Sequence, residues 1–305
     1  MYFNDGTTDA PKLRVYLNLD NLCDLRSDSG GPAVDAPDRD ECLAAGGFEG
    51  VQLTSNELPL LGSSLPFCGL DRISIPSEAG RIIAEHATRG DQCLTVHAGW
   101  GIEDESEVAH LVESILEASQ KYQLPVFIET HRSTITQDMW RTVQIIKRFP
   151  EVRFNGDFSH YYCGQEMVYG GMEMKLAFMA PIFERIGFIH GRIASPGGMQ
   201  IPIDDISSRP RMAHGFCDFF AHFREMWTLA MVGFIRAASH GDVLIFAPEL
   251  LAGTYYYARL FPDAAGELVE ESDRYAQAQL YAKVARNCFT AAKKSLGISI
   301  QSNKM

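Results

Sequence analysis

The sequence predicts a (β/α)8 barrel built as a single domain over residues 1–305. Short β-rich apolar runs alternate with segments of helical periodicity, which is typical of βαβ units and a parallel sheet. Eight such runs occur, the number of strands in a closed barrel. A doubly wound open sheet shares this alternation, but it needs a glycine-rich turn after the first strand, and LNLDNLCDL at 17–25 has none.

The predicted strands are runs of four to eight residues rich in Val, Ile, Leu and Phe. They lie at 12–19, 48–53, 70–75, 93–97, 125–130, 152–157, 185–190 and 242–249. Helices are expected between them, at 77–89, 105–122, 137–149, 166–184, 213–239 and 272–295. The second of these is the clearest, because Val108, Leu111 and Ile115 lie on one apolar stripe. Asp104 and Glu107 also have the spacing of a capping box at its start.

Two long loops interrupt this pattern, at about 20–46 and 191–212. The first is rich in Asp, Gly and Pro, and the second contains SPGGMQIP. Loops of this length in compact domains are usually lids or substrate loops. No composition shift marks a linker, so one domain is the simpler interpretation.

Charge and hydropathy restrict the partners. The chain carries 27 Lys and Arg against 39 Asp and Glu, a net charge of −12, which opposes binding to a nucleic-acid backbone. No apolar run approaches 18 residues and the first residues are polar, so we expect no membrane partner and a cytoplasmic location. The expected partner is a small-molecule polyhydroxy substrate, and self-association into a homo-oligomer stays open.

Four predicted strands end in residues that can bind a metal ion. They are Glu129, Asp157, His190 and Glu249. In a closed barrel the carboxyl ends of the strands surround one mouth, so these side chains should converge. Three carboxylates in a dry cleft repel one another unless a cation lies between them, which indicates one divalent metal ion. Oxygen-rich ligation with one imidazole favours Mn²⁺ or Mg²⁺ and tolerates Co²⁺ or Zn²⁺.

Five further polar or aromatic residues lie at or just beyond the same strand ends. They are His97, Trp100, His131, His160 and Arg192. We expect them to bind substrate: Arg192 could hold a carboxylate or an enolate in its fork, and Trp100 could act as an apolar platform.

Several strand-end segments resemble those of the xylose isomerase-like TIM barrels, the sugar phosphate isomerase/epimerase superfamily. They are VFIETHR (126–132), GDFSHYY (156–162), FIHGR (188–192) and APEL (247–250). The resemblance implies that Glu129, Asp157, His190 and Glu249 bind one metal ion. It also implies that both glutamates move the proton, as in ketose 3-epimerases. Gln52 departs from the pattern, since the second strand of many members ends in Glu.

The resemblance implies a divalent-metal-dependent isomerase or epimerase. Such an enzyme would abstract a proton next to the carbonyl of a sugar or related polyhydroxy compound, through an enediolate. The alternative is a metal-dependent dehydratase of the 3-dehydroshikimate or inosose kind, because ETHRSTIT (129–136) resembles a motif of the former.

Two other functions are weaker interpretations. A phosphodiesterase like the AP endonucleases would need more histidines, and 191–212 contains Asp204 and Asp205 but no histidine. A sugar-binding barrel without activity would be expected to have lost a ligand. Metal content separates the cases, with one ion for the isomerase, three for the phosphodiesterase and none for the binding protein.

Overall fold

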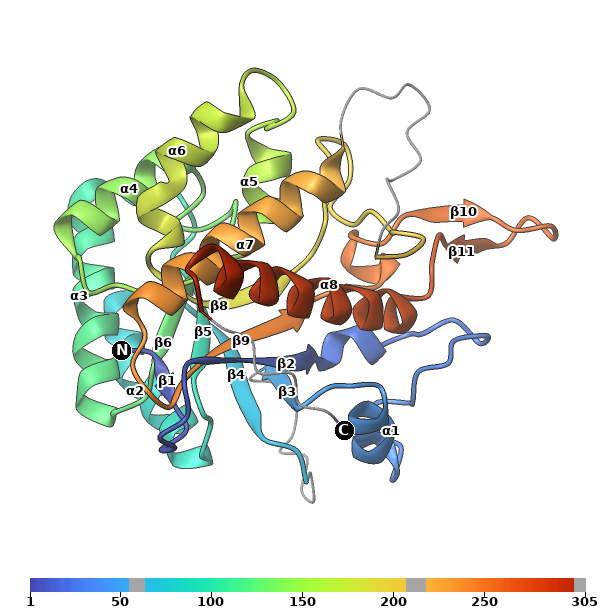
Figure 1. The fold of residues 1–305 in the computed structure, drawn as a ribbon, viewed down its shortest axis with the longest axis horizontal. Helices are drawn as coiled ribbons and strands as arrows, with labels where there is room; N and C mark the ends of the chain where they lie inside the picture. The colour runs from blue at the N-terminus through green and yellow to red at the C-terminus, as the bar shows by residue number, and fades with distance from the viewer. Residues whose placement is uncertain (55–63, 207–217, 299–305) are drawn as a thin grey trace.

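Eight parallel strands close into a barrel in the computed structural model, which describes residues 1–54, 64–206 and 218–298 (Figure 1). Each strand pairs with the next along the chain, and the last pairs with the first. In chain order the barrel strands are β2 (Lys12–Asn18), β3 (Gly50–Thr54), β4 (Phe67–Ile73), β5 (Leu94–Ala98), β6 (Val126–Glu129), β7 (Phe154–Asn155), β8 (Ile186–Gly191) and β9 (Asp242–Pro248). The predicted (β/α)8 barrel and its eight strands are confirmed. A short strand, β1 (Phe3–Asn4), pairs antiparallel with the start of β9.

The helices form a layer around the barrel (Figure 1). They are α1 (Arg39–Ala45), α2 (Pro76–Arg89), α3 (Glu105–Tyr122), α4 (Met139–Arg148), α5 (Phe158–Gly164), α6 (Met172–Phe183), α7 (Phe219–Ala237) and α8 (Arg274–Ser295). The predicted capping box of α3 is present, because Asp104 accepts from the backbone N–H of Glu107 while the Glu107 side chain accepts from that of Asp104. None of the described helices combines the length and hydropathy that a membrane span requires.

Several elements were not predicted. The region 20–46, expected to be a loop, contains α1 and most of a 3₁₀ helix, η1 (Leu19–Leu22). The helix expected at 166–184 begins only at Met172, and α5 precedes it as a separate helix. A hairpin of β10 (Leu260–Pro262) and β11 (Leu268–Glu270) precedes α8. These elements are short, so few turns of periodicity mark them in the sequence. Residues 213–217 of the helix expected at 213–239 lie outside the described residues.

The barrel interior changes from apolar to polar along the strands. A buried cluster fills the interior, drawn from five barrel strands, from the residue before β5 and from β1. It consists of Phe3, Tyr16, Cys68, Cys93, Phe127, Phe188, Val243, Ile245 and Ala247. Because side chains alternate across a strand, the residue two positions later faces the same way. Phe127 is thus followed by Glu129, and Phe188 by His190. The apolar layer closes the barrel below the polar mouth.

Candidate metal centre

The four predicted ligands meet at the carboxyl end of the barrel. Glu129 ends β6, Asp157 follows β7 and caps α5, His190 lies in β8, and Glu249 follows β9. One ligand atom from each lies within 4.8 Å of the others, and all four residues are buried. The structure therefore brings together the set selected from strand ends. Its metal-binding role stays a prediction.

His190 lies between two carboxylates. Its Nδ1 is 3.1 Å from Glu129 Oε2 and 3.4 Å from Glu249 Oε2. Burial lowers the pKa of His190, but Glu249 and Glu129 outweigh burial and raise it to about 9. The same two carboxylates that stabilise a proton on Nδ1 would stabilise a metal cation there.

Gln52 fixes the orientation of this imidazole. Its Oε1 lies 2.8 Å from His190 Nε2 and also accepts a hydrogen bond from Asn18, while its amide nitrogen donates to Thr95. With the amide oxygen on Nε2, that nitrogen keeps its proton in either charge state, so Nδ1, which faces the carboxylates, is the ring nitrogen that would bind a metal ion. Sequence reasoning treated Gln52 only as a missing carboxylate. Gln52 lies near the carboxyl end of β3 and pairs in register with Asn18 of β2. Its position near a strand end was the signal that could have placed it at the mouth.

Several buried polar atoms at the mouth make no hydrogen bond to any described residue. Among the four ligands these are Glu129 Oε1, Asp157 Oδ2 and His190 Nδ1. Buried polar atoms in proteins are normally paired, so a group of unpaired ones calls for an explanation. Three carboxylates and one imidazole nitrogen form a donor set that fits a divalent cation. The residues present therefore fit the metal that the sequence implies.

The carboxylates of the site have divergent pKa values. Burial raises the pKa of Glu129, but His97 and His190 outweigh it and hold the pKa well below its usual range. Burial likewise opposes ionisation of Asp157, and Arg192 and His160 outweigh it to lower that pKa. For Glu249, burial dominates and the pKa is raised. Divergent pKa values of neighbouring carboxyl groups are typical of acid–base pairs.

Arg192 is buried against the ligands themselves. Its guanidinium pairs with Glu249 and lies 3.3 Å from Asp157 Oδ2. It provides positive charge beside two carboxylates, and its Nε and one terminal nitrogen make no hydrogen bond to described residues. Contact of Arg192 with substrate stays a prediction.

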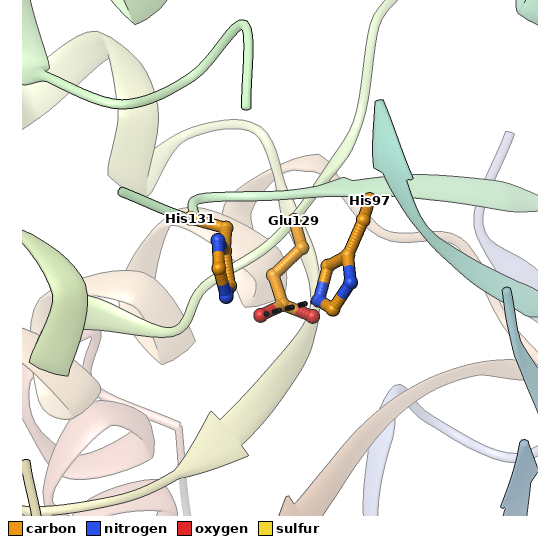
Figure 2. A group of neighbouring side chains, drawn as sticks. All are labelled: His97, Glu129 and His131. Atoms are coloured by element: carbon orange, nitrogen blue, oxygen red, sulfur yellow. Dashed lines mark ion pairs between the residues drawn. The ribbon is translucent and has the colours of Figure 1, made fainter. Parts of the chain in front are cut away.

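Three histidines line the Glu129 side of the mouth. The ring centroids of His97 and His131 are 4.4 Å apart, and those of His131 and His160 are 3.8 Å apart. Figure 2 shows His97 and His131 on either side of Glu129. Burial, together with the neighbouring His160 and His97, lowers the pKa of His131, and burial is also the main cause that lowers the pKa of His160. The three rings lie at the mouth, and their contact with substrate stays a prediction.

Two aromatic residues mark the rim. Trp100 is 54% exposed, and the Arg72 guanidinium lies 4.1 Å from its ring, so Trp100 stands at the edge rather than inside the mouth. Tyr257 was missed by sequence reasoning. Its ring lies 4.6 Å from the Arg192 guanidinium and edge-on to His160 at 6.5 Å. It comes from the segment between β9 and β10, where no motif marks it.

Comparisons with known proteins show the fold. No family model and no curated protein matches this chain. L-ribulose 3-epimerase has a similar structure, with a TM-score of 0.52, 12% identity and coverage of 96% of this chain and 100% of that one. The probable 3-DHS dehydratase AsbF from Bacillus anthracis gives a TM-score of 0.52 at 15% identity, covering 90% and 99%. A xylose isomerase-like TIM barrel protein from Mycobacterium smegmatis, in complex with magnesium, gives a TM-score of 0.50 at 12% identity, with coverage of 96% of this chain and 100% of that one. These likenesses show a shared (β/α)8-barrel fold.

Proposed function

We propose that the protein is a divalent-metal-dependent isomerase or epimerase that acts on a sugar or related polyhydroxy carbonyl compound. The observation that carries this proposal is the convergence of four buried ligands at the mouth of the barrel, three of which present atoms without a hydrogen-bond partner among the described residues. The structural likeness to L-ribulose 3-epimerase supports the same class of reaction.

Glu129, Asp157, His190 and Glu249 would hold the metal ion, and their three carboxylates favour Mn²⁺ or Mg²⁺. When bound, the cation supplies Lewis-acid polarisation of a substrate carbonyl. The protein orients these ligands through their neighbours: Gln52 fixes the ring of His190, and Asn155 donates to Glu129 Oε2 at 3.1 Å.

The two glutamates would move the proton. In one direction Glu129, whose lowered pKa keeps it ionised, takes a proton from the carbon next to the carbonyl. The C–H electron pair then forms a C=C bond to the carbonyl carbon, and the π pair of the C=O bond moves onto the oxygen. Glu249, whose raised pKa lets it carry a proton, returns one to carbon. Return to the same carbon gives an epimer, and return to the next carbon gives an isomer.

Buried polar groups around the metal site would recognise the hydroxyl groups of the substrate. Both ring nitrogens of His160 are buried and make no hydrogen bond to described residues, so they are available to substrate oxygens. His97, His131 and Trp100 line the same side of the mouth and its rim. A small polar molecule fits this arrangement, and the acidic net charge disfavours nucleic acid as a partner.

Solvent-deuterium exchange into a ketose tests the proposal. The metal-loaded wild-type chain should exchange the proton next to the carbonyl, and Glu129→Gln and Glu249→Gln should each reduce the rate at least about 100-fold, the usual contribution of general acid–base catalysis. Glu117→Gln, an exposed glutamate on α3, is the matched control and should keep the wild-type rate. Full exchange in both variants with a turned-over substrate would exclude the two-glutamate mechanism.

A dehydratase is the second candidate. The supporting observation is His131, a half-buried imidazole beside Glu129, and the likeness to AsbF points the same way. Loss of a β-hydroxyl from the same carbanionic intermediate would give an alkene. Proton NMR of a cyclic 3-keto acid incubated with the enzyme separates the reactions, because dehydration creates a vinylic resonance and epimerisation does not.

A further inference from the structure

We propose that His97, Glu129 and His131 form a second divalent-cation site, which shares Glu129 with the four-ligand metal site. One ligand atom from each of these residues lies within 4.8 Å of the others. Figure 2 shows the two imidazole rings flanking the carboxylate. The second site has only Glu129 in common with the four-ligand site, so it does not depend on the isomerase assignment.

Glu129 presents its two oxygens to two different groups. Its Oε2 lies 3.1 Å from His190 Nδ1 and accepts a hydrogen bond from Asn155. Its Oε1 lies 3.2 Å from His97 Nε2, on the other side of the carboxylate. A carboxylate oriented in this way can bridge two metal ions, and paired ions in two-metal enzymes lie about 3.5–4 Å apart. The geometry of Glu129 therefore allows a second ion beside the first.

Unpaired atoms give independent support. His97 Nε2 and Glu129 Oε1 are buried and, despite their short separation, neither makes a hydrogen bond to a described residue. Glu129 itself is fully buried. Two buried atoms that face each other without hydrogen-bond geometry are left unsatisfied by the protein. A cation between the ring nitrogen and the carboxylate oxygen would satisfy both.

The local backbone supplies the third ligand. His131 lies two residues after Glu129, immediately beyond β6, and His97 lies on the adjacent strand β5. One existing contact competes with metal binding: the Ser133 backbone N–H donates to His131 Nδ1 at 3.2 Å. Binding through Nε2 would require the proton to move to Nδ1. Ser133 is exposed, so water can accept its N–H when the tautomer changes.

The donor sets of the two sites differ, and so should their preferred ions. Two imidazoles and one carboxylate suit Zn²⁺ or Co²⁺ and leave coordination positions open for water or substrate, as in catalytic zinc sites. The four-ligand site has three carboxylates and should accept the harder Mn²⁺ or Mg²⁺. We therefore expect the second site to fill with Zn²⁺ or Co²⁺ and to remain empty with Mg²⁺ alone.

Metal titration and anomalous diffraction on the full chain test the proposal. The chelator-treated protein should bind two Zn²⁺ ions, and crystals soaked in zinc chloride should show one anomalous peak beside His97 and another among Asp157, His190 and Glu249. His97→Asn and His131→Asn should each lower the binding affinity for one Zn²⁺ ion at least about tenfold and leave the affinity for the other unchanged. His110→Asn, an exposed histidine on α3, is the matched control and should bind two.

The outcomes separate the two metal sites. A single peak among Asp157, His190 and Glu249 at saturating zinc would overturn the second site and leave the proposed function standing. Two ions in His97→Asn and in His131→Asn would overturn the second site as well. Binding of no ion by a chain whose circular dichroism spectrum shows it is folded would overturn both the second site and the proposed metal enzyme.

Discussion

Two charged clusters of the described barrel, each with buried members, differ in their hydrogen bonding. The mouth cluster consists of Glu129, Asp157, His190, Arg192 and Glu249. The helix cluster consists of His86 and Arg89 on α2, Asp71 in β4, and Asp91 before β5. In the helix cluster, Asp91 accepts from Arg89 at 2.6 Å and pairs with His86 Nδ1 at 2.7 Å, while His86 Nε2 faces Asp71 at 3.3 Å. Every buried polar side-chain atom of the helix cluster therefore has a partner, whereas the mouth cluster has several without one.

This difference separates stability from function. A buried charge is tolerable when complementary groups surround it, and the helix cluster meets that condition with its own residues. The mouth cluster has carboxylates in excess, and their unpaired atoms face a common space. We infer that the helix cluster holds α2 to the barrel and that the mouth cluster is completed by a ligand.

The largest expected effect is on activity at the mouth. Asp157→Asn keeps the shape of the side chain but removes a charged metal ligand, so activity should fall about 1000-fold. That factor follows because Lewis-acid catalysis contributes several kcal/mol and each 1.36 kcal/mol is tenfold in rate. Steady-state kinetics with an identified ketose measures the loss, and metal analysis of the same sample should show reduced occupancy. Near wild-type turnover in this variant would contradict the assignment of Asp157.

The next effect is on stability at the helix cluster. Asp91→Asn leaves His86 and Arg89 without their shared carboxylate, and breaking a buried pair typically costs about 3–5 kcal/mol. Arg89 is partly exposed, so we expect a smaller loss, about 2–3 kcal/mol in the free energy of unfolding. Urea denaturation measures it, and turnover below the transition should be unchanged. A loss of activity without a loss of stability would place a functional role here.

A smaller effect is expected from the residue that orients His190. Gln52→Leu removes the acceptor for Nε2 without touching a ligand, and such changes typically weaken metal binding about 10–100-fold. Competition with a fluorescent chelator measures the affinity. Gln120→Leu on the exposed face of α3 serves as the control. Unchanged affinity in Gln52→Leu would show that the mouth does not depend on this contact.

The smallest effect is a pH dependence of stability from His86. Burial lowers the pKa of His86, but Asp71 and Asp91 outweigh it and raise the pKa above its ordinary value of 6.5. A raised pKa means that the stabilisation is fully present below pH 6.5 and disappears as pH rises through the folded-state pKa. The difference in unfolding free energy between wild type and His86→Gln should therefore shrink with rising pH. Urea denaturation of both proteins at a series of pH values from below 6.5 upward measures this difference. A difference that stays constant or grows with pH would contradict the prediction.

Much of the fold could be predicted because its signals are local. Strand runs and the stripe and capping box of α3 depend on residues within a few positions of one another, and all eight strands are present. Short elements gave weak signals: α1 and α5 have seven residues each. Asp157 caps α5, because its side chain accepts from the Ser159 backbone N–H, so one residue both caps a helix and faces the metal site.

The candidate site was predicted only in outline. Strand-end position selected Glu129, Asp157, His190 and Glu249, because parallel strands of a closed barrel end at one mouth. It gave no information on Gln52 as a support for His190, on Tyr257 at the rim, or on Arg192 pairing with Glu249. These contacts join strands and loops whose order in space depends on closure of the barrel.

The sequence by itself determined that the four candidate ligands stand at strand ends, since alternation along a strand and the position of its end are properties of short segments. The tertiary structure decided which of their atoms remain unpaired. Gln52 and His190 are 138 positions apart, yet their contact sets which imidazole nitrogen points at the carboxylates. Hydrogen bonds of this kind depend on distances of a few ångströms between separate strands, and only the closed barrel fixes those distances.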